Sequence, residues 1–141
     1  MASSTPEPSK KTSVTLKLAG IYNLVFGCFV IVFPGVAFQL SGMPTPLYPE
    51  IWQCVGMIVG VYGIGYLIAS KDPDRHWPIV FVGLLGKVLG PIGFLTSPLP
   101  WSFGILIFLN DLVWWIPFSR ILLMAGRRAN LTESPGEIRF H

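Results

Sequence analysis

The chain has 141 residues, of which 52% are hydrophobic and only 12% carry a charged side chain. Soluble domains have roughly 25% charged residues, so this composition argues against an ordinary soluble domain. The net charge is +3 at pH 7. A soluble bundle with a very apolar core is the alternative, and it is disfavoured because helices that are apolar on all sides are buried or span membranes.

The N-terminal residues 1–15 are polar and rich in Ser, Thr and Pro, which predicts a disordered tail without a cleavable signal peptide. Residues 16–125 are expected to form one domain of four transmembrane helices, and residues 126–141 a second polar tail. Each apolar run approaches the roughly 20 residues that a membrane helix requires. The runs cover residues 18–38, 51–69, 78–96 and 101–124. The predicted fold class is an all-α, integral membrane four-helix bundle.

The distribution of basic residues predicts the orientation of these helices. Nine of the ten Lys and Arg residues fall on one side of a four-span arrangement, and the loops at 39–50 and 97–100 contain none. The positive-inside rule then places both termini and the 70–77 loop in the cytoplasm. This asymmetry accounts for the basic balance, so the expected partner is the lipid bilayer and not nucleic acid.

One lysine and one aspartate lie inside the predicted spans. The loop at 97–100 is so short that the third and fourth helices must be adjacent and antiparallel. Lys87 and Asp111 each lie twelve positions from residue 99, at the centre of this loop. We therefore expect them to face each other near mid-bilayer, roughly 14 Å from the nearest helix end. A lysine stem reaches only about 6 Å, so snorkelling does not bring Lys87 to water.

A lone charge at that depth costs about 2.5–3.5 kcal/mol on insertion scales, so Lys87 and Asp111 are predicted to pair. The pair is either ionic or neutral and hydrogen-bonded. Asn110 and Tyr62, at similar depth, are predicted to extend the network. We interpret these residues as a ligand-binding or proton-handling site, because ionisable groups inside membranes are usually functional. The alternative is a structural pair that holds two helices in register.

Glycines recur at helical spacing in the second and third spans, namely Gly56, Gly60 and Gly63, followed by Gly83, Gly86, Gly90 and Gly93. Small residues let membrane helices approach closely, so helix packing is the first interpretation. The second is a flat groove for a ring-shaped or lipid ligand. Gln53 and Asn23 are interpreted as supporting polar groups that form helix–helix hydrogen bonds.

The sequence contains few residues with redox or metal chemistry. Cys28 and Cys54 are the only cysteines, and their predicted depths differ by roughly 12 Å, so no internal disulfide is expected. His76 and His141 both fall outside the spans, and neither a metal site nor a Ser/His/Asp arrangement is expected. The cofactor, if there is one, is not identified by any motif.

Four segments carry a resemblance to a known group of proteins: YPEIWQCVGM at 48–57, KDPDRHWP at 71–78, GLLGKVLGPIGF at 83–94 and NDLVWWIPF at 110–118. With the size and the four spans, they resemble small uncharacterised bacterial membrane proteins, some of which are labelled alkyl hydroperoxide reductase. The architecture is similar to the DoxX-like four-helix group, which includes subunits tied to quinone-linked oxidation. The resemblance implies a location in the bacterial inner membrane but no particular reaction.

Three functions are compatible with these features. We favour a binding or accessory subunit that holds a lipophilic small molecule, or a helix of a membrane-protein partner, with Lys87 and Asp111 as polar anchor. One alternative is a membrane redox subunit that handles a quinone-like substrate. The other is a small proton-coupled transporter that uses Asp111. An enzyme is less favoured, because no electron carrier or nucleophile is visible in the sequence.

Overall fold

The computed structural model describes residues 10–132, and this part of the chain is all-α. The helices are α1 (Lys10–Val32), α2 (Val36–Leu40), α3 (Pro49–Ala69), α4 (Trp77–Leu95) and α5 (Trp101–Thr132). All except α2 are long and apolar enough to cross a membrane. The four predicted spans are therefore present as four long helices.

The outer ends of the helical region extend beyond the predicted boundaries. Helix α1 begins at Lys10, inside the predicted tail, because its first turns pack against the turn after α3 and Ser13 Oγ donates a hydrogen bond of 2.6 Å to the Ser70 carbonyl. Helix α5 continues past residue 126 to Thr132, and Arg128 forms an ion pair with Asp74 of the same turn. The predictions for residues 1–9 and 133–141 lie outside the described residues.

The first span was predicted to run to residue 38, and this is wrong at its C-terminal end. Helix α1 stops at Val32, and the short helix α2 follows after Pro34. Proline has no backbone N–H and clashes with the preceding turn, so it ends the regular hydrogen-bonding pattern. Gly42, with φ of 69°, then reverses the chain in a conformation that side chains disfavour.

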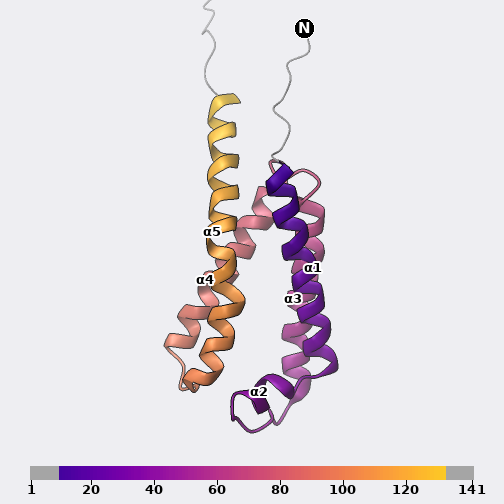
Figure 1. The fold of residues 1–141 in the computed structure, drawn as a ribbon, viewed down its shortest axis with the longest axis vertical. Coiled ribbons are helices and arrows are strands. Elements are labelled where there is room, and N and C mark those ends of the chain that lie inside the picture. The colour runs from indigo at the N-terminus through magenta and orange to yellow at the C-terminus, as the bar shows by residue number, and fades with distance from the viewer. Residues whose placement is uncertain (1–9, 133–141) are drawn as a thin grey trace, which may run out of the picture.

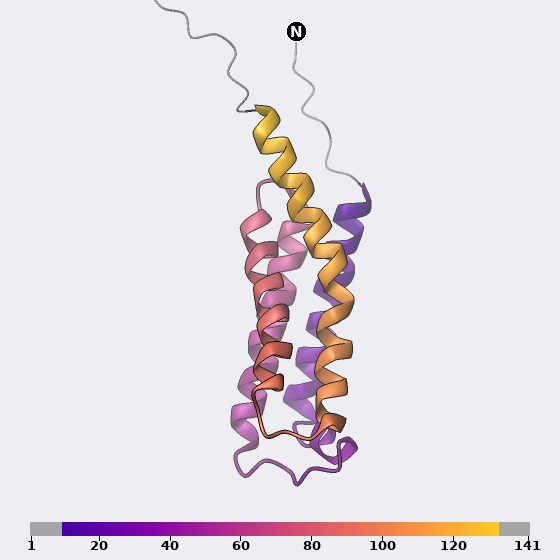
Figure 2. The ribbon, with the colours of Figure 1, turned by 90° about the vertical axis from the view of Figure 1, so that its left-hand side faces the viewer.

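The long helices form two hairpins, α1 with α3 and α4 with α5 (Figure 1). Helix α4 starts beside α3 at the 70–76 turn and crosses to α5 at the opposite end. Figure 2 shows the α4–α5 hairpin in front, with its loop at the same end as α2. The start of α1 and the end of α5 both lie at the end of the bundle that carries the turn between α3 and α4.

All four long helices meet in a buried core near that turn. The core consists of Leu16 and Ala19 from α1, Tyr66 and Ala69 from α3, Val80 from α4, and Phe118 and Ile121 from α5. Below this core, toward α2, the two hairpins diverge. The fold therefore joins the hairpins through this core at one end, and the space between them lies beyond the core, toward α2.

Glycines allow α1 and α3 to lie in direct backbone contact. A Cβ atom on Gly27 would come within 2.5 Å of the Gly56 carbonyl oxygen, and one on Gly63 within 2.7 Å of the Gly20 oxygen. Gly60 also lies against Gly27. The glycines of the second span thus serve close helix packing, as the first interpretation proposed, and their partners are on α1.

Candidate functional site

Lys87 and Asp111 lie side by side between α4 and α5. Lys87 Nζ is 3.3 Å from Asp111 Oδ1, and the two residues are only 7% and 8% exposed. The expectation from the short 97–100 loop therefore matches the geometry. Removing one partner of such a buried pair leaves the other uncompensated, which typically costs about 3–5 kcal/mol.

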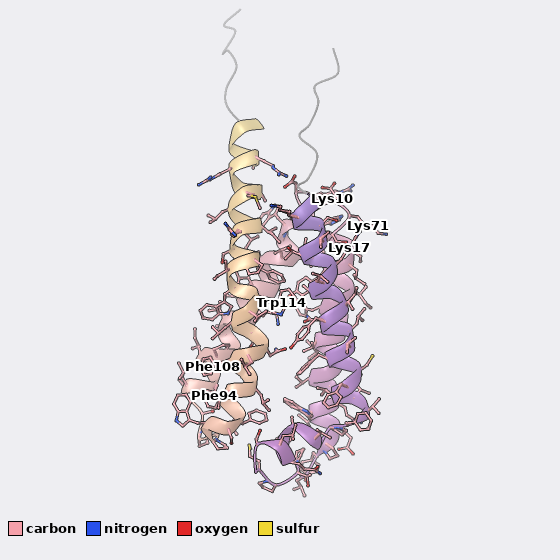
Figure 3. The ribbon with its side chains drawn as sticks, in the orientation of Figure 1. Lys10, Lys17, Lys71, Phe94, Phe108 and Trp114 are labelled. Atoms are coloured by element: carbon pink, nitrogen blue, oxygen red, sulfur yellow. The ribbon has the colours of Figure 1, made fainter. Side chains whose placement is uncertain are left out.

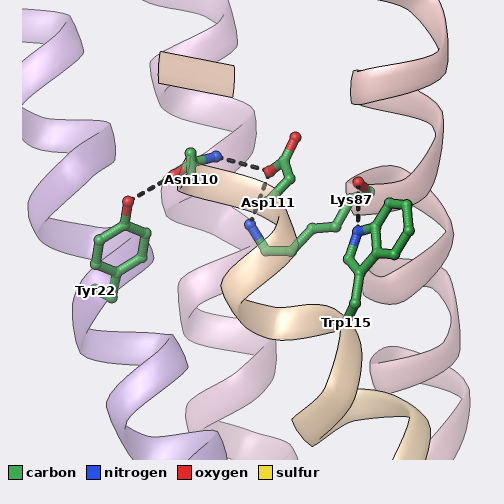
Figure 4. A network of polar contacts seen from close by, with 5 residues as sticks. All are labelled: Tyr22, Lys87, Asn110, Asp111 and Trp115. Atoms are coloured by element: carbon green, nitrogen blue, oxygen red, sulfur yellow. Dashed lines mark hydrogen bonds and ion pairs between the residues drawn. The ribbon is translucent and has the colours of Figure 1, made fainter. Parts of the chain in front are cut away.

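A chain of hydrogen bonds extends from this pair to the other hairpin (Figure 4). Asn110 Nδ2 donates to Asp111 Oδ1 over 2.8 Å, so Asn110 extends the network as predicted. The Tyr22 hydroxyl donates to Asn110 Oδ1 over 2.7 Å. Because Tyr22 is on α1, the chain connects both hairpins.

Tyr62 was expected in this network, but Tyr22 occupies the position next to Asn110. Tyr62 instead packs against Tyr66, with ring centroids 6.2 Å apart, and lines the cavity described below. Counting equal numbers of residues from a connecting loop places side chains only on helices that are consecutive in the chain. Helices α1 and α5 are far apart in sequence, so this counting could not identify Tyr22.

A second contact holds the backbone of α4 at Lys87. Pro91 lies four residues after Lys87 and lacks the N–H that would normally bond to the Lys87 carbonyl. Trp115 Nε1 of α5 donates to this carbonyl over 3.0 Å instead. Trp115 therefore satisfies the acceptor that Pro91 leaves free, and it fixes α4 against α5 beside the buried pair.

The glycines of α4 do not form one continuous seam. A Cβ on Gly83 would clash with the Tyr66 ring, and one on Gly90 would come within 2.6 Å of Asp111 Oδ2. Gly86 and Gly93 have nothing within 4 Å of such a Cβ. Gly83 and Gly90 thus make room for specific side chains, whereas Gly86 leaves open space.

That open space is a cavity of about 560 Å³ between the two hairpins. Its polar lining residues are Tyr22, Asn23, Trp52, Tyr62, Tyr66, Lys87, Asn110 and Asp111. The remainder of its wall is apolar, with Phe26, Phe29, Val55, Val59, Leu106 and Ile107 among the residues. The network around Asp111 therefore forms a polar patch on an otherwise apolar wall.

Two polar atoms of lining residues have no hydrogen-bond partner among the described residues. They are Asn23 Oδ1, on a residue that is only 3% exposed, and Trp52 Nε1. A buried polar group without a partner typically costs about 1–3 kcal/mol. By contrast, Gln53 Nε2 donates to the Ile31 carbonyl over 2.7 Å, which is the helix–helix hydrogen bond predicted for it. Asn23 makes no such bond in the described part of the chain.

Helix α2 and an aromatic cluster cover the end of the cavity away from the basic residues. The rings of Phe38, Trp52 and Phe103 have centroids 5.3–6.0 Å apart. Ser102 Oγ donates to the Ser41 carbonyl over 2.7 Å and attaches the segment after α2 to α5. Cys28 and Cys54 are both free and exposed in the structure.

Comparison with known proteins gives no further assignment. The chain significantly matches no protein-family model, no curated protein and no solved structure, so the resemblance to DoxX-like proteins stays a prediction.

Proposed function

We propose that the protein spans a membrane four times, with the described chain ends and the 70–76 turn in the cytoplasm. Its outward-facing side chains support insertion, because soluble monomers rarely expose large contiguous apolar surfaces. They include Val25 and Val32 of α1, Val61 of α3, Leu89 of α4, and Val113 and Ile116 of α5. The choice of a bacterial inner membrane rests on the resemblance alone.

The basic side chains support this orientation. Lys10, Lys17 and Lys71 lie at the end of the bundle that carries the 70–76 turn (Figure 3). A reporter that folds only in the cytoplasm should be active after Thr132 and inactive when inserted at residues 43–46. The reverse pattern would refute the orientation, and activity at both sites would refute the spans.

We further propose that the protein binds a lipophilic small molecule in the cavity between the hairpins. The observation that carries this proposal is the combination of an apolar cavity with a polar network in its wall, at the centre of which lies the buried Lys87–Asp111 pair. Small-molecule sites typically have volumes of about 300–1,000 Å³ and mostly apolar walls with a few fixed polar groups. The cavity of about 560 Å³ and the Tyr22–Asn110–Asp111–Lys87 network fit this description.

The test is native mass spectrometry and absorbance spectroscopy of protein purified in a mild detergent. We expect a lipophile to copurify with the wild type. Gly86→Phe should deplete it, because Gly86 lines the cavity and opens onto free space. Gly93→Phe is the matched control on the same helix, since Gly93 also faces open space but does not line the cavity. A ligand-free wild type, or full occupancy in Gly86→Phe, would contradict the proposal.

The two alternative functions, a redox subunit and a proton-coupled transporter, would use the same residues but give different experimental results. A redox subunit would copurify with a quinone-like ring that has its own absorbance. A proton-coupled transporter would release protons from Asp111 as substrate moves, and Asp111→Asn would abolish uptake by vesicles while the fold persists. A partner helix in the cavity would appear as a second polypeptide in the mass spectrum.

A further inference from the structure

The charges around the cavity limit the kind of ligand it can take, if it binds a lipophile as proposed above. Among residues 10–132, Lys87 and Asp111 are the only Lys, Arg, His, Asp or Glu residues that line it. Their formal charges cancel both as an ion pair and after proton transfer between them. A carboxylate, phosphate or ammonium head group would therefore be left without a counter-charge in an apolar surrounding, which is strongly unfavourable. An uncharged ligand fits the site.

Asn23 specifies a hydrogen-bond donor on that ligand. Its Oδ1 is an acceptor, is buried, and has no partner in the described part of the chain. Asn23 follows Tyr22 in α1 and lines the same cavity as Lys87. Ester and ether lipids have no donor to offer, whereas a hydroxyl group does.

Lys87 offers the complementary donor. A lysine ammonium has three N–H groups, and the structure uses one of them for Asp111 Oδ1. Another can donate to a ligand oxygen in the cavity that Lys87 lines together with Asn23. A hydroxyl group is the smallest uncharged group that both accepts from an ammonium and donates to an amide oxygen. Apolar side chains such as Phe26 and Ile107 would surround the rest of the molecule.

From these three observations we infer that the ligand is an uncharged lipophile with a hydroxyl group, which Asn23 and Lys87 bind together. The inference assigns a direct ligand contact to Asn23. Its buried oxygen then gains the partner that the protein itself does not supply.

The test compares three probes with the same unsaturated hydrocarbon chain: oleyl alcohol, methyl oleate and oleate. Brominated forms of each are titrated into delipidated wild-type protein, and quenching of tryptophan fluorescence is recorded. Trp52 lines the cavity and is the expected reporter. Trp52→Phe should therefore reduce the quenching, whereas Trp77→Phe, at the opposite end of the bundle, should not. We expect oleyl alcohol to bind about tenfold more tightly than either other probe, as one additional satisfied hydrogen bond predicts.

Asn23→Leu should remove the preference for the alcohol over the methyl ester without abolishing binding of the ester. Gln53→Leu is the matched control, because this amide bonds to the Ile31 carbonyl and does not line the cavity. The wild-type ranking tests the inference even if Asn23→Leu does not fold. Equal or tighter binding of the ester or of oleate overturns the hydroxyl inference and leaves the proposed function in place. Failure of all three probes to bind a protein that also purifies without ligand overturns both.

Discussion

The hydroxyl of Tyr22 and the amide oxygen of Asn110 lie 2.7 Å apart and form a hydrogen bond between the two helical hairpins. The residues are 88 positions apart in sequence. The Tyr22 ring also packs against Trp114 of α5, with centroids 5.6 Å apart, but α1 and α5 make few other contacts near the cavity, since the shared core lies closer to the 70–76 turn. This bond therefore helps to determine how far the hairpins separate beside the cavity.

Tyr22→Phe removes the donor and leaves the Asn110 oxygen without its partner. We expect a loss of about 0.5–1.5 kcal/mol in the free energy of unfolding, the usual range for one hydrogen bond. Reversible unfolding with SDS in mixed micelles measures this loss. Tyr48→Phe, at an exposed position before α3, is the control and should have almost no effect. Equal stability of Tyr22→Phe and wild type would show that the bond does not hold the hairpins together.

A large part of the fold follows from local sequence patterns. Apolar runs of membrane-spanning length predicted the four long helices, and the short 97–100 loop placed Lys87 opposite Asp111. Both deductions depend only on neighbouring segments and on the regular rise of a helix. The end of α1 before Pro34 was not predicted, because proline is tolerated inside some membrane helices and the sequence does not show which helices end at a proline.

Features that depend on packing between distant helices were not predicted. The role of Tyr22 requires knowledge of how α1 faces α5, and the contact of Gly27 with Gly56 requires the register of α1 on α3. The extra turns of α1 and α5 depend on Ser70 and Asp74 in a loop that lies far from both in sequence. Only a tertiary structure provides these relationships.

Trp115 and Pro91 are expected to be energetically coupled through the carbonyl of Lys87. Trp115→Phe leaves this buried acceptor without a donor and should cost about 1–3 kcal/mol of stability. Pro91→Ala restores an N–H four residues after Lys87, so Trp115→Phe should cost clearly less in that background. SDS unfolding of the two single variants and the double variant gives the coupling energy. Additive losses would mean that Trp115 acts by packing and not through this hydrogen bond.

The pairing of Lys87 with Asp111 predicts strong non-additivity. Lys87→Met leaves a buried carboxylate and Asp111→Asn leaves a buried ammonium, so either change alone should cost about 3–5 kcal/mol. The double variant removes both charges and should be much more stable than the sum of the single losses predicts. Glu50→Gln, at an exposed position in the first turn of α3, is the control and should shift stability by less than about 0.5 kcal/mol.

The double variant also distinguishes a purely structural role of the Lys87–Asp111 pair from a role in ligand binding. If the double variant folds and still copurifies with the wild-type ligand, the pair only holds helix register. A stable double variant without ligand supports a role in binding.

Gly90 is expected to be necessary for the position of the Asp111 carboxylate. A methyl group at residue 90 would come within 2.6 Å of Asp111 Oδ2, so Gly90→Ala must displace this side chain from Lys87 and Asn110. We expect a loss of about 1–3 kcal/mol, as for other insertions into a packed interior. Gly93→Ala is the matched control, because it lies one turn further along α4 and its methyl group would have nothing within 4 Å.

The decisive measurement repeats Gly90→Ala in an Asp111→Ala background. The carboxylate is absent there, so the added methyl group has no oxygen to displace and the loss should disappear. A loss of the same size in both backgrounds would show that Gly90 is required by the backbone of α4. If Gly90→Ala proves as harmless as Gly93→Ala, the Asp111 side chain has room to move, and its contacts with Lys87 and Asn110 do not depend on this glycine.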